Sequence, residues 1–363
     1  MRAAICREFG QKLEIGEVAL APPGPGEVRA RVRAVAICHS DVTYADGGWG
    51  GELPAVYGHE AAGVVSEVGE GVTAFAPGDR VVITLVRNCG ACPCCARNMR
   101  GSCETRFPLD AQSPLSLPGG GSLVHGLKTA AFAEAVVTDQ SQMVKIGDDI
   151  GFEVASLLAC GVITGFGAVV NTAALPPGMD VVVIGTGGVG LNAVQGAALT
   201  GSRRVIAVDR SADKLTAAEA FGASHLVDGA ATDAVKAVRA LTGGRGADFV
   251  FVTVGSTEAM GQSYRMLAPG GASVLVGMAH QDARSTFNPL ALSDQSCRIL
   301  GSKMGQSDIR ADIPMLIGLY REGRLKLDEL ISHRYPLEEI NTALDNVRRG
   351  IGLRNVVLME GGA

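Results

Sequence analysis

The stretch VVVIGTGGVG, residues 181–190, determines how the rest of the chain is interpreted. Its apolar start predicts a buried strand, and the pattern G-x-G-x-x-G from Gly185 through Gly187 to Gly190 is typical of a tight turn that opens a helix. Nineteen residues after Gly190, Asp209 ends the next apolar run, 205–208. A strand, a glycine turn, a helix and an acidic residue at this distance predict a dinucleotide-binding unit.

The residue types in this unit indicate which dinucleotide it takes. Glycines let backbone N–H groups approach a pyrophosphate at a helix N-terminus. The expected contacts are Gly185, Gly187, Gly188, Val189 and Gly190. A carboxylate at Asp209 would bind the ribose hydroxyls and repel a 2′-phosphate, which favours NAD, while the adjacent Arg210 leaves NADP as an alternative.

The pattern of apolar residues changes along the chain. Before residue 150, short apolar runs at 27–36, 61–68 and 80–84 stand between glycine and proline turns, which predicts a β-rich core. After about residue 154, apolar runs alternate with alanine-rich helical stretches. The expected strands are 181–184, 204–208, 249–254, 272–276 and 298–300, and the expected helices include 191–199 and 214–221. Alternation of this kind predicts a doubly wound parallel sheet.

Composition excludes several classes of function. The 363 residues carry a net charge of −5, which argues against a nucleic-acid binder, because such proteins present a basic face. The apolar stretch 154–179 is long enough to span a bilayer. Four glycines and the pair Pro176-Pro177 interrupt it, so we expect a buried core segment and no membrane contact. The N-terminal residues show no secretory pattern, and we expect a cytoplasmic protein.

Four of the nine cysteines form a metal-ligand pattern. Cys89, Cys92, Cys95 and Cys103 follow the spacing C-x2-C-x2-C-x7-C. Four thiolates within fifteen residues can close a tetrahedral shell around Zn²⁺ with no open position, so this lobe, 88–104, is expected to be structural. Cys94 lies off the spacing and is expected to be a spectator.

A second zinc set is scattered along the sequence. Cys38, His59 and Cys160 offer two thiolates and one imidazole, which with a vacant fourth position would form a catalytic zinc site. Because these residues lie far apart in sequence, their spacing alone does not group them, and a lone cysteine or histidine is more often a packed core residue.

Along nearly its whole length the sequence resembles the zinc-containing medium-chain alcohol dehydrogenases. The motifs that carry the resemblance are Cys38-His39-Ser40-Asp41, Gly58-His59-Glu60, the four-cysteine lobe, Cys160, the 185–190 loop with Asp209, and Arg354. The resemblance implies an α/β fold: a mainly-β catalytic domain (1–161) with the zinc lobe, a Rossmann NAD-binding domain (162–304), and a C-terminal segment (305–363) that returns to the first domain. It also implies two zinc ions per subunit.

The resemblance assigns individual roles as well. Cys38, His59 and Cys160 would hold the catalytic zinc, with Asp41 orienting His59 and Glu60 assisting ligand exchange. Ser40 would accept the hydroxyl proton of the substrate and pass it along the nicotinamide ribose in a proton relay. Many relatives end this relay with a histidine at the position that Thr43 occupies here. Further NAD contacts would come from His39, Thr164, Lys214, Gly277 and Arg354.

The substrate pocket is expected to be apolar. The resemblance places Ser40, Trp49, Leu85, Leu127 and Met278 around the alcohol. No cationic residue is among them, so we expect a hydrophobic primary alcohol or aldehyde, medium-chain or aromatic. The alternatives are a glutathione-linked formaldehyde dehydrogenase, which Trp49 disfavours because it carries no charge, and a non-catalytic zinc-bearing relative. The length of the segment 103–132 favours a homodimer over a homotetramer.

Overall fold

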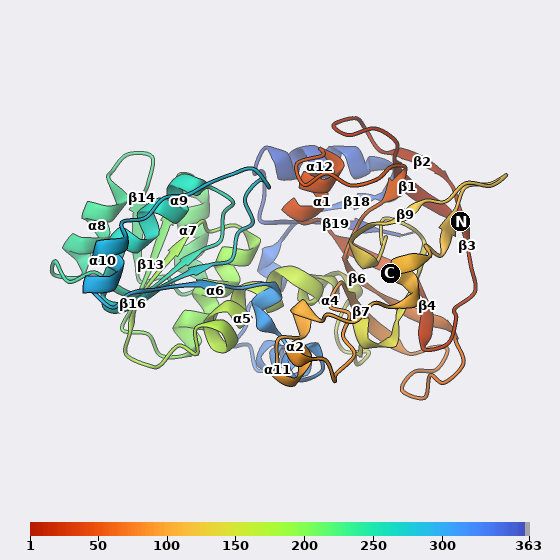
Figure 1. The fold of residues 1–363 in the computed structure, drawn as a ribbon, viewed down its shortest axis with the longest axis horizontal. Coiled ribbons are helices and arrows are strands. Elements are labelled where there is room, and N and C mark those ends of the chain that lie inside the picture. Colours follow the sequence, from red (N-terminus) through yellow and green to blue (C-terminus); the bar gives the residue numbers. More distant parts are fainter. Residues whose placement is uncertain (360–363) are drawn as a thin grey trace. The chain divides into compact units, whose positions relative to one another are not determined.

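The computed structural model describes residues 1–359, which form two compact units (Figure 1). Unit 1 comprises residues 1–160, 308–320 and 327 onward. Unit 2 comprises residues 161–307 together with the short segment 321–326. The chain therefore passes into unit 2 directly after Cys160, and the C-terminal part belongs to unit 1 except for those six residues.

Unit 2 is built on a six-stranded parallel sheet. Its strands, in spatial order, are β14 (His225–Asp228), β13 (Arg204–Asp209), β12 (Asp180–Ile184), β15 (Ala247–Val252), β16 (Leu267–Leu275) and β17 (Arg298–Gly301). The order reverses at β12: the chain moves first to β13 and β14 on one side and then to β15 on the other. This is the doubly wound arrangement, in which ligands generally bind beyond the carboxyl ends of the strands where the strand order reverses; Gly185 follows β12 at that point.

Helices connect these strands. They are α5 (Ile163–Gly167), α6 (Gly188–Leu199), α7 (Ala212–Ala220), α8 (Ala234–Leu241), α9 (Thr257–Ser263) and α10 (Pro289–Asp294), with shorter turns at Ala168–Thr172, Tyr264–Met266 and Met304–Gln306. Most of α6 is buried, in keeping with its alanine- and glycine-rich sequence. Gly165 of α5 allows close packing, because a Cβ there would lie 2.1 Å from the Val189 carbonyl oxygen.

Unit 1 contains three sheets. The largest joins β11 (Met143–Lys145), β7 (Arg80–Thr84), β6 (Glu60–Val68), β4 (Glu27–Ala36), β19 (Arg354–Leu358) and β18 (Ile331–Pro336), with β10 (Ala135–Asp139) also on β4. A second joins β2 (Glu14–Glu17), β1 (Arg2–Cys6), β5 (Ala55–Val56) and β9 (Val124–His125), and a third joins β3 (Ala19–Leu20) to β8 (Leu115–Ser116). Strands β4 and β7 lie where the apolar runs predict them, whereas β18 lies in a part of the chain where no strand was predicted.

Most helices of unit 1 are short. They are α1 (His39–Ala45), α2 (Pro93–Ala96), α3 (Pro108–Ala111), α4 (Phe152–Leu157), α11 (Ile309–Arg321) and α12 (Ile340–Arg348), with single turns at Arg100–Ser102, Gly126–Lys128, Gln140–Gln142, Leu158–Val162, Asp328–Leu330 and Leu337–Glu339. One apolar core, which includes Ile5, Val35, Phe132 and Ile340, underlies the sheets and α12.

The helical stretch Phe152–Thr172 is long and apolar enough to cross a membrane. However, 89% of its most apolar window is buried inside the protein, as expected for a core helix. It contains π-helical turns at Leu158–Val162 and Ala168–Thr172. Such turns are often found at functional sites, and the first of them holds Cys160.

Candidate active site

Four metal-binding side chains converge in the buried part of unit 1. Cys38 is the N-cap of α1, His59 and Glu60 stand at the start of β6, and Cys160 lies in the π-helical turn Leu158–Val162. One ligand atom from each lies within 4.8 Å of the others. Ligands of a tetrahedral zinc ion are about 3.3–3.8 Å apart, so this group has the dimensions of a metal site. The fold thus brings together residues that sequence spacing could not group.

Asp41 fixes the orientation of His59. Its Oδ1 lies 2.9 Å from His59 Nδ1 and accepts the backbone N–H of Gly58 at 3.0 Å. Its Oδ2 accepts the backbone N–H of Cys38 at 2.9 Å, which also caps the first turn of α1. A ring nitrogen held in this way is a donor, so the other nitrogen, Nε2, carries the lone pair.

The geometry of His59 provides a test of whether a metal fits. Its side chain is fully buried, and Nε2 has no hydrogen-bond partner among residues 1–359. A buried polar atom without a partner is energetically unfavourable, and a zinc ion beside the two thiols would satisfy it. The donor set of sulfur, sulfur and nitrogen is one that Zn²⁺ prefers.

The two thiols share their protonation. A hydrogen bond from Cys160 and the neighbouring His59 hold the pKa of Cys38 well below its ordinary value. The same interaction with Cys38, together with burial, raises the pKa of Cys160. The interaction between the two sulfurs thus shifts the two pKa values in opposite directions, and the thiolate is the form in which a cysteine binds zinc.

Glu60 forms a buried ion pair that the sequence did not predict. Arg354, at the start of β19, donates a hydrogen bond from Nη2 to Glu60 Oε2, and both side chains are buried. Burial raises the pKa of Glu60 to about 7, although the Arg354 charge opposes the shift. The pair joins the start of β6 to the start of β19, strands that are 294 residues apart in the sequence at this point. No local pattern could have indicated this contact.

The four-cysteine group of the lobe also converges. One sulfur from each of Cys89, Cys92, Cys95 and Cys103 lies within 4.8 Å of the others. Backbone N–H groups of Ala91 and Cys92 donate to Cys89 Sγ at 3.4 and 3.3 Å. A hydrogen bond from Thr105, followed by these two, lowers the pKa of Cys89 to about 6. The loop thus favours the thiolate form of Cys89, which is the form that binds zinc.

Cys94 lies outside that group. Its thiol donates to Glu104 Oε1 at 3.1 Å, and this hydrogen bond raises its pKa. All nine cysteines have free thiols. The lobe is therefore held by its four clustered sulfurs and contains no disulfide among the described residues.

In unit 2 the glycine loop has the shape that a pyrophosphate needs. A Cβ on Gly190 would lie 1.8 Å from the carbonyl oxygen of Gly185, so only glycine fits there. Gly185 itself has a φ of +88°. By contrast, a Cβ on Gly187, the N-cap of α6, would meet no atom within 4 Å. Space beside this backbone and a helix N-terminus together suit a phosphate group.

Asp209 connects the glycine loop to the end of β13. Its Oδ2 accepts hydrogen bonds from the backbone N–H and the hydroxyl of Thr186, at 2.7 and 3.1 Å. Its Oδ1 accepts the backbone N–H groups of Arg210 and Ser211 at 2.7 and 3.0 Å. The carboxylate therefore stands next to the loop, where its charge would face the adenosine ribose.

The other residues expected to bind NAD have varied surroundings. Thr164 is buried, with its hydroxyl 3.7 Å from Met304 Sδ. Gly277 packs against Val254, whose backbone a Cβ would approach to 2.4 Å. Lys214 lies in the first turn of α7, His39 is exposed at the start of α1, and Arg354 is the partner of Glu60. Their contacts with NAD stay predictions.

The residues expected to form the substrate wall are distributed over both units. Ser40, Trp49, Leu85 and Leu127 are partly buried in unit 1, and Met278 belongs to unit 2, where it is 64% exposed. Trp49 packs edge-on against Tyr44, with 5.2 Å between ring centroids, and Tyr44 stacks on Tyr57 at 5.8 Å. This aromatic row was not foreseen, and the wall as a whole stays a prediction.

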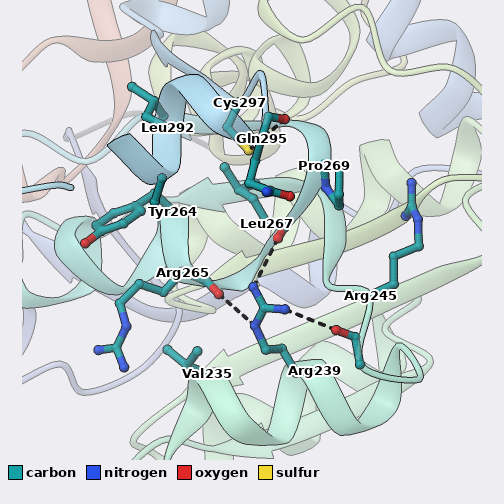
Figure 2. A pocket seen from close by; sticks show the side chains of 12 residues that line it. Val235, Arg239, Arg245, Tyr264, Arg265, Leu267, Pro269, Leu292, Gln295 and Cys297 are labelled. Carbon is teal, nitrogen blue, oxygen red and sulfur yellow. Dashed lines mark hydrogen bonds between the residues drawn. The ribbon is translucent and has the colours of Figure 1, made fainter. Parts of the chain in front are cut away.

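A separate surface pocket of about 700 Å³ lies in unit 2 (Figure 2). Arg239 beside it donates to the backbone carbonyls of Arg265, Gly244 and Leu267. Arg245 pairs with Asp248 at 2.7 Å. None of the expected NAD contacts lines this pocket. Its arginines support the local fold, and the pocket is distinct from the glycine loop.

Two family models match the chain. The model described as alcohol dehydrogenase GroES-like domain matches residues 24–148, which lie in unit 1. The model described as zinc-binding dehydrogenase matches residues 188–319. The first match includes His59 and the four-cysteine lobe, and the second begins in the glycine loop.

Relatives match over the full length. An alcohol dehydrogenase from Malus domestica is 35% identical over 370 residues, covering 99% of this chain and 97% of that protein. The crystal structure of an alcohol dehydrogenase zinc-binding domain protein from Burkholderia ambifaria superposes with a TM-score of 0.93 at 33% identity, covering 98% of each chain. That of benzyl alcohol dehydrogenase from Acinetobacter calcoaceticus gives 0.91 at 29% identity, covering 99% of each chain.

Proposed function

Because the chain belongs to the zinc-containing medium-chain alcohol dehydrogenase family, we propose that it transfers a hydride between a hydrophobic primary alcohol, or its aldehyde, and NAD(H). The observation that carries this proposal is the buried group of Cys38, His59 and Cys160, whose imidazole is oriented by Asp41. A fold retained only for structure would have no reason to keep beside two thiols a buried nitrogen that has no hydrogen-bond partner among residues 1–359. The substrate class rests on the apolar character of the expected wall.

The chemistry divides between metal, cofactor and chain. Zinc is a Lewis acid that can lower the pKa of bound water from 15.7 to about 7, and it acts on an alcohol hydroxyl in the same way. Ser40, in the first turn of α1 and two residues after Cys38, would accept the hydroxyl proton while its own hydroxyl proton passes on toward the nicotinamide ribose. Bound NAD⁺ would accept the hydride from the carbon that bears this hydroxyl, so the alcohol would lose two electrons and NAD⁺ would gain them. Glu60 stays buried beside the ligands, restrained by Arg354.

The two units take different parts in this function. Unit 1 contains both groups of zinc-ligand side chains and would supply most of the substrate wall. Unit 2 holds the glycine loop and Asp209 and binds NAD. The aromatic row suits a small neutral substrate. We place the enzyme in the cytoplasm, as expected from its sequence.

The assembly is a homodimer formed through an edge of the unit 2 sheet. Strand β17 ends the sheet, so its outer backbone groups are available to pair with a second copy. Exposed apolar side chains lie on and before it: Ile299 is 39% exposed, Phe287 48% and Leu290 76%. Light scattering should give the mass of two chains, and a four-chain mass would support the tetramer instead.

Zinc counting and a substrate panel test the proposed function. The purified protein should hold two zinc ions per chain and reduce NAD⁺ with hydrophobic primary alcohols. Cys38→Ala should lose one zinc and abolish turnover while NADH binding and most of the fold remain. Cys92→Ala should lose the other zinc and mainly destabilise the protein, because it opens a closed shell. One zinc per wild-type chain, or turnover retained by Cys38→Ala, would refute the proposal.

A further inference from the structure

A turn of unusual backbone conformation lies close to the zinc ligands in unit 1. Leu127, Lys128 and Ala130 have φ angles of 52°, 63° and 51°. Residues other than glycine avoid this left-handed region, and three of them within four positions is uncommon. Such strain persists only where the surroundings fix the backbone, and it is concentrated at functional sites. The contacts of this turn, residues 126–130, therefore indicate which groups fix its backbone and which part of the site it supports.

Two buried side chains hold the turn through one carbonyl group. The carbonyl oxygen of Lys128 accepts hydrogen bonds from Arg87 Nη2 at 3.2 Å and from Gln142 Nε2 at 3.0 Å. Arg87 Nε also donates to Gln142 Oε1 at 2.7 Å, so the two side chains fix each other. Asp110, 2.9 Å from Arg87 Nη1, supplies the opposite charge that a buried guanidinium needs. We name Arg87 and Gln142 the Lys128 clamp.

The other side of the turn contacts the residue before His59. The Thr129 hydroxyl lies 2.9 Å from the Gly58 carbonyl oxygen and 3.0 Å from that of Leu127. The backbone N–H of Ala131 donates to the same Gly58 oxygen at 2.9 Å. Asp41 accepts the N–H of Gly58, so this residue is fixed at both its N–H and its carbonyl. The strained turn is thus connected by hydrogen bonds to the backbone that carries the His59 imidazole.

We propose that Arg87 and Gln142 are positioning residues for the zinc site: the Lys128 clamp holds the strained turn, and the turn fixes Gly58 and thereby His59. The inference rests on the proposed function only in taking His59 as a zinc ligand. Neither clamp residue belongs to the group of metal-binding side chains, so both act through the turn. A merely structural role predicts a loss of stability without a change at the metal.

Zinc release separates these two roles without requiring turnover. The zinc-loaded protein is mixed with a chromogenic chelator, and the ion held by His59 is identified as the one that Cys38→Ala lacks. Gln142→Met removes half of the clamp, and Thr129→Val removes only the hydroxyl that faces Gly58. Each should release this zinc about tenfold faster, the lower range of effects seen when groups that orient metal ligands are removed. The zinc of the four-cysteine lobe should be released at the wild-type rate.

Two further variants control for general damage. Thr129→Ser keeps the hydroxyl and should keep slow release. Thr138→Val alters another fully buried threonine of unit 1, whose hydroxyl has no hydrogen-bond partner among residues 1–359, and should leave both zinc rates unchanged. Substitution of cobalt for zinc adds a spectroscopic readout, because its visible bands should shift in Thr129→Val but not in Thr138→Val.

A rescue experiment tests the strained turn itself. Glycine adopts a φ of +63° freely, so Lys128→Gly should make the turn less dependent on the clamp. In the double variant Gln142→Met/Lys128→Gly, the logarithm of the zinc release rate should return at least halfway from the Gln142→Met value to the wild-type value. Unchanged zinc release in both Gln142→Met and Thr129→Val, or no recovery in the double variant, would overturn the inference. A wild-type protein that binds two zinc ions but oxidises no alcohol would refute the proposed function and leave this test intact.

Discussion

Asp41 Oδ1 lies 2.9 Å from His59 Nδ1, and neither side chain is exposed to solvent. The same carboxylate binds the backbone N–H groups of Cys38 and Gly58. One buried acid therefore fixes the imidazole ligand, the backbone of the thiolate ligand and the residue that precedes the histidine. Its negative charge also compensates part of the charge of a bound divalent ion, so it stabilises the metal both by geometry and by electrostatics.

Asp41→Asn should weaken zinc binding and activity together. The amide keeps the size of the carboxylate, but its NH₂ group would face either the Cys38 N–H or the His59 and Gly58 donors, because an amide has only one oxygen. Loss of a group that orients a histidine ligand typically lowers metal affinity or activity by about 10- to 100-fold. Competition with a chelator measures the affinity, and kcat with an alcohol measures the activity.

Asp46→Asn is the matched control for this change. Asp46 caps the other end of α1 and pairs with Arg348 at 2.7 Å on the surface. A surface ion pair contributes about 0–1 kcal/mol, so this variant should lose little stability and no zinc. Equal zinc affinity in Asp41→Asn and the wild type would show that His59 does not need this carboxylate.

Two glycines of one loop should respond differently to alanine. Gly187→Ala adds a methyl group into open space at a φ of −75°, so the free energy of unfolding should change by less than about 1 kcal/mol. That methyl would occupy the space where we place the pyrophosphate, and NADH should bind at least roughly tenfold more weakly. Gly190→Ala should instead lower the free energy of unfolding by about 3 kcal/mol or more, because its Cβ would collide with the Gly185 carbonyl.

Chemical denaturation and NADH fluorescence titration measure these two quantities. If Gly187→Ala bound NADH as tightly as the wild type, the pyrophosphate would not approach this backbone. If Gly190→Ala were fully stable, the loop would have to differ from the observed conformation.

Asp209 should set the preference for NAD⁺ over NADP⁺. We expect kcat/KM to favour NAD⁺ by at least roughly tenfold, which corresponds to about 1.4 kcal/mol. Asp209→Asn keeps the size of the side chain, and its one oxygen can still accept from Thr186, but it lacks the charge that repels a 2′-phosphate, so the preference should shrink. Asp228→Asn is the control, because Asp228 occupies the same position on the neighbouring strand β14 that Asp209 occupies on β13. Equal use of both cofactors by the wild type would refute the role assigned to Asp209.

The sequence could predict features that depend on short spacings. The glycine loop and the four-cysteine lobe each lie within about twenty residues, and their residue types restrict the backbone and the chemistry directly. The strands β4 and β7 follow from local apolar runs. The doubly wound order could be expected from the alternation of strands and helices, because parallel strands need crossover connections.

Contacts between distant residues could not be predicted in this way. Arg87 meets Gln142 across 55 positions, and Arg354 meets Glu60 across 294. No single motif contains both members of either pair, and an isolated arginine or glutamine in a sequence is usually interpreted as a surface residue. The left-handed backbone at Leu127 and Lys128 was equally hidden, since such turns are usually indicated by glycine or asparagine. The Lys128 clamp became visible only once the fold placed these groups together.

Alcohols of increasing size should be increasingly good substrates. Trp49 packs edge-on against Tyr44, which in turn stacks on Tyr57, and these contacts favour a fixed aromatic wall over a side chain that collapses into the pocket. Each buried methylene contributes about 0.8 kcal/mol, so three added methylenes could raise kcat/KM by roughly fiftyfold. Steady-state kinetics with ethanol, butanol, hexanol and benzyl alcohol, followed at the NADH absorbance, measure this trend.

Variants of the aromatic row show whether Trp49 supplies that wall. Trp49→Ala removes the largest apolar surface, so kcat/KM for hexanol and benzyl alcohol should fall at least roughly tenfold while that for ethanol changes little. Tyr44→Phe keeps the ring that supports Trp49 and should preserve the wild-type order of substrates. A wild-type series that falls from ethanol onward would mean that Trp49 fills the space near the metal. In that case Trp49→Ala should improve the longer alcohols, because it would open the pocket that the indole had closed.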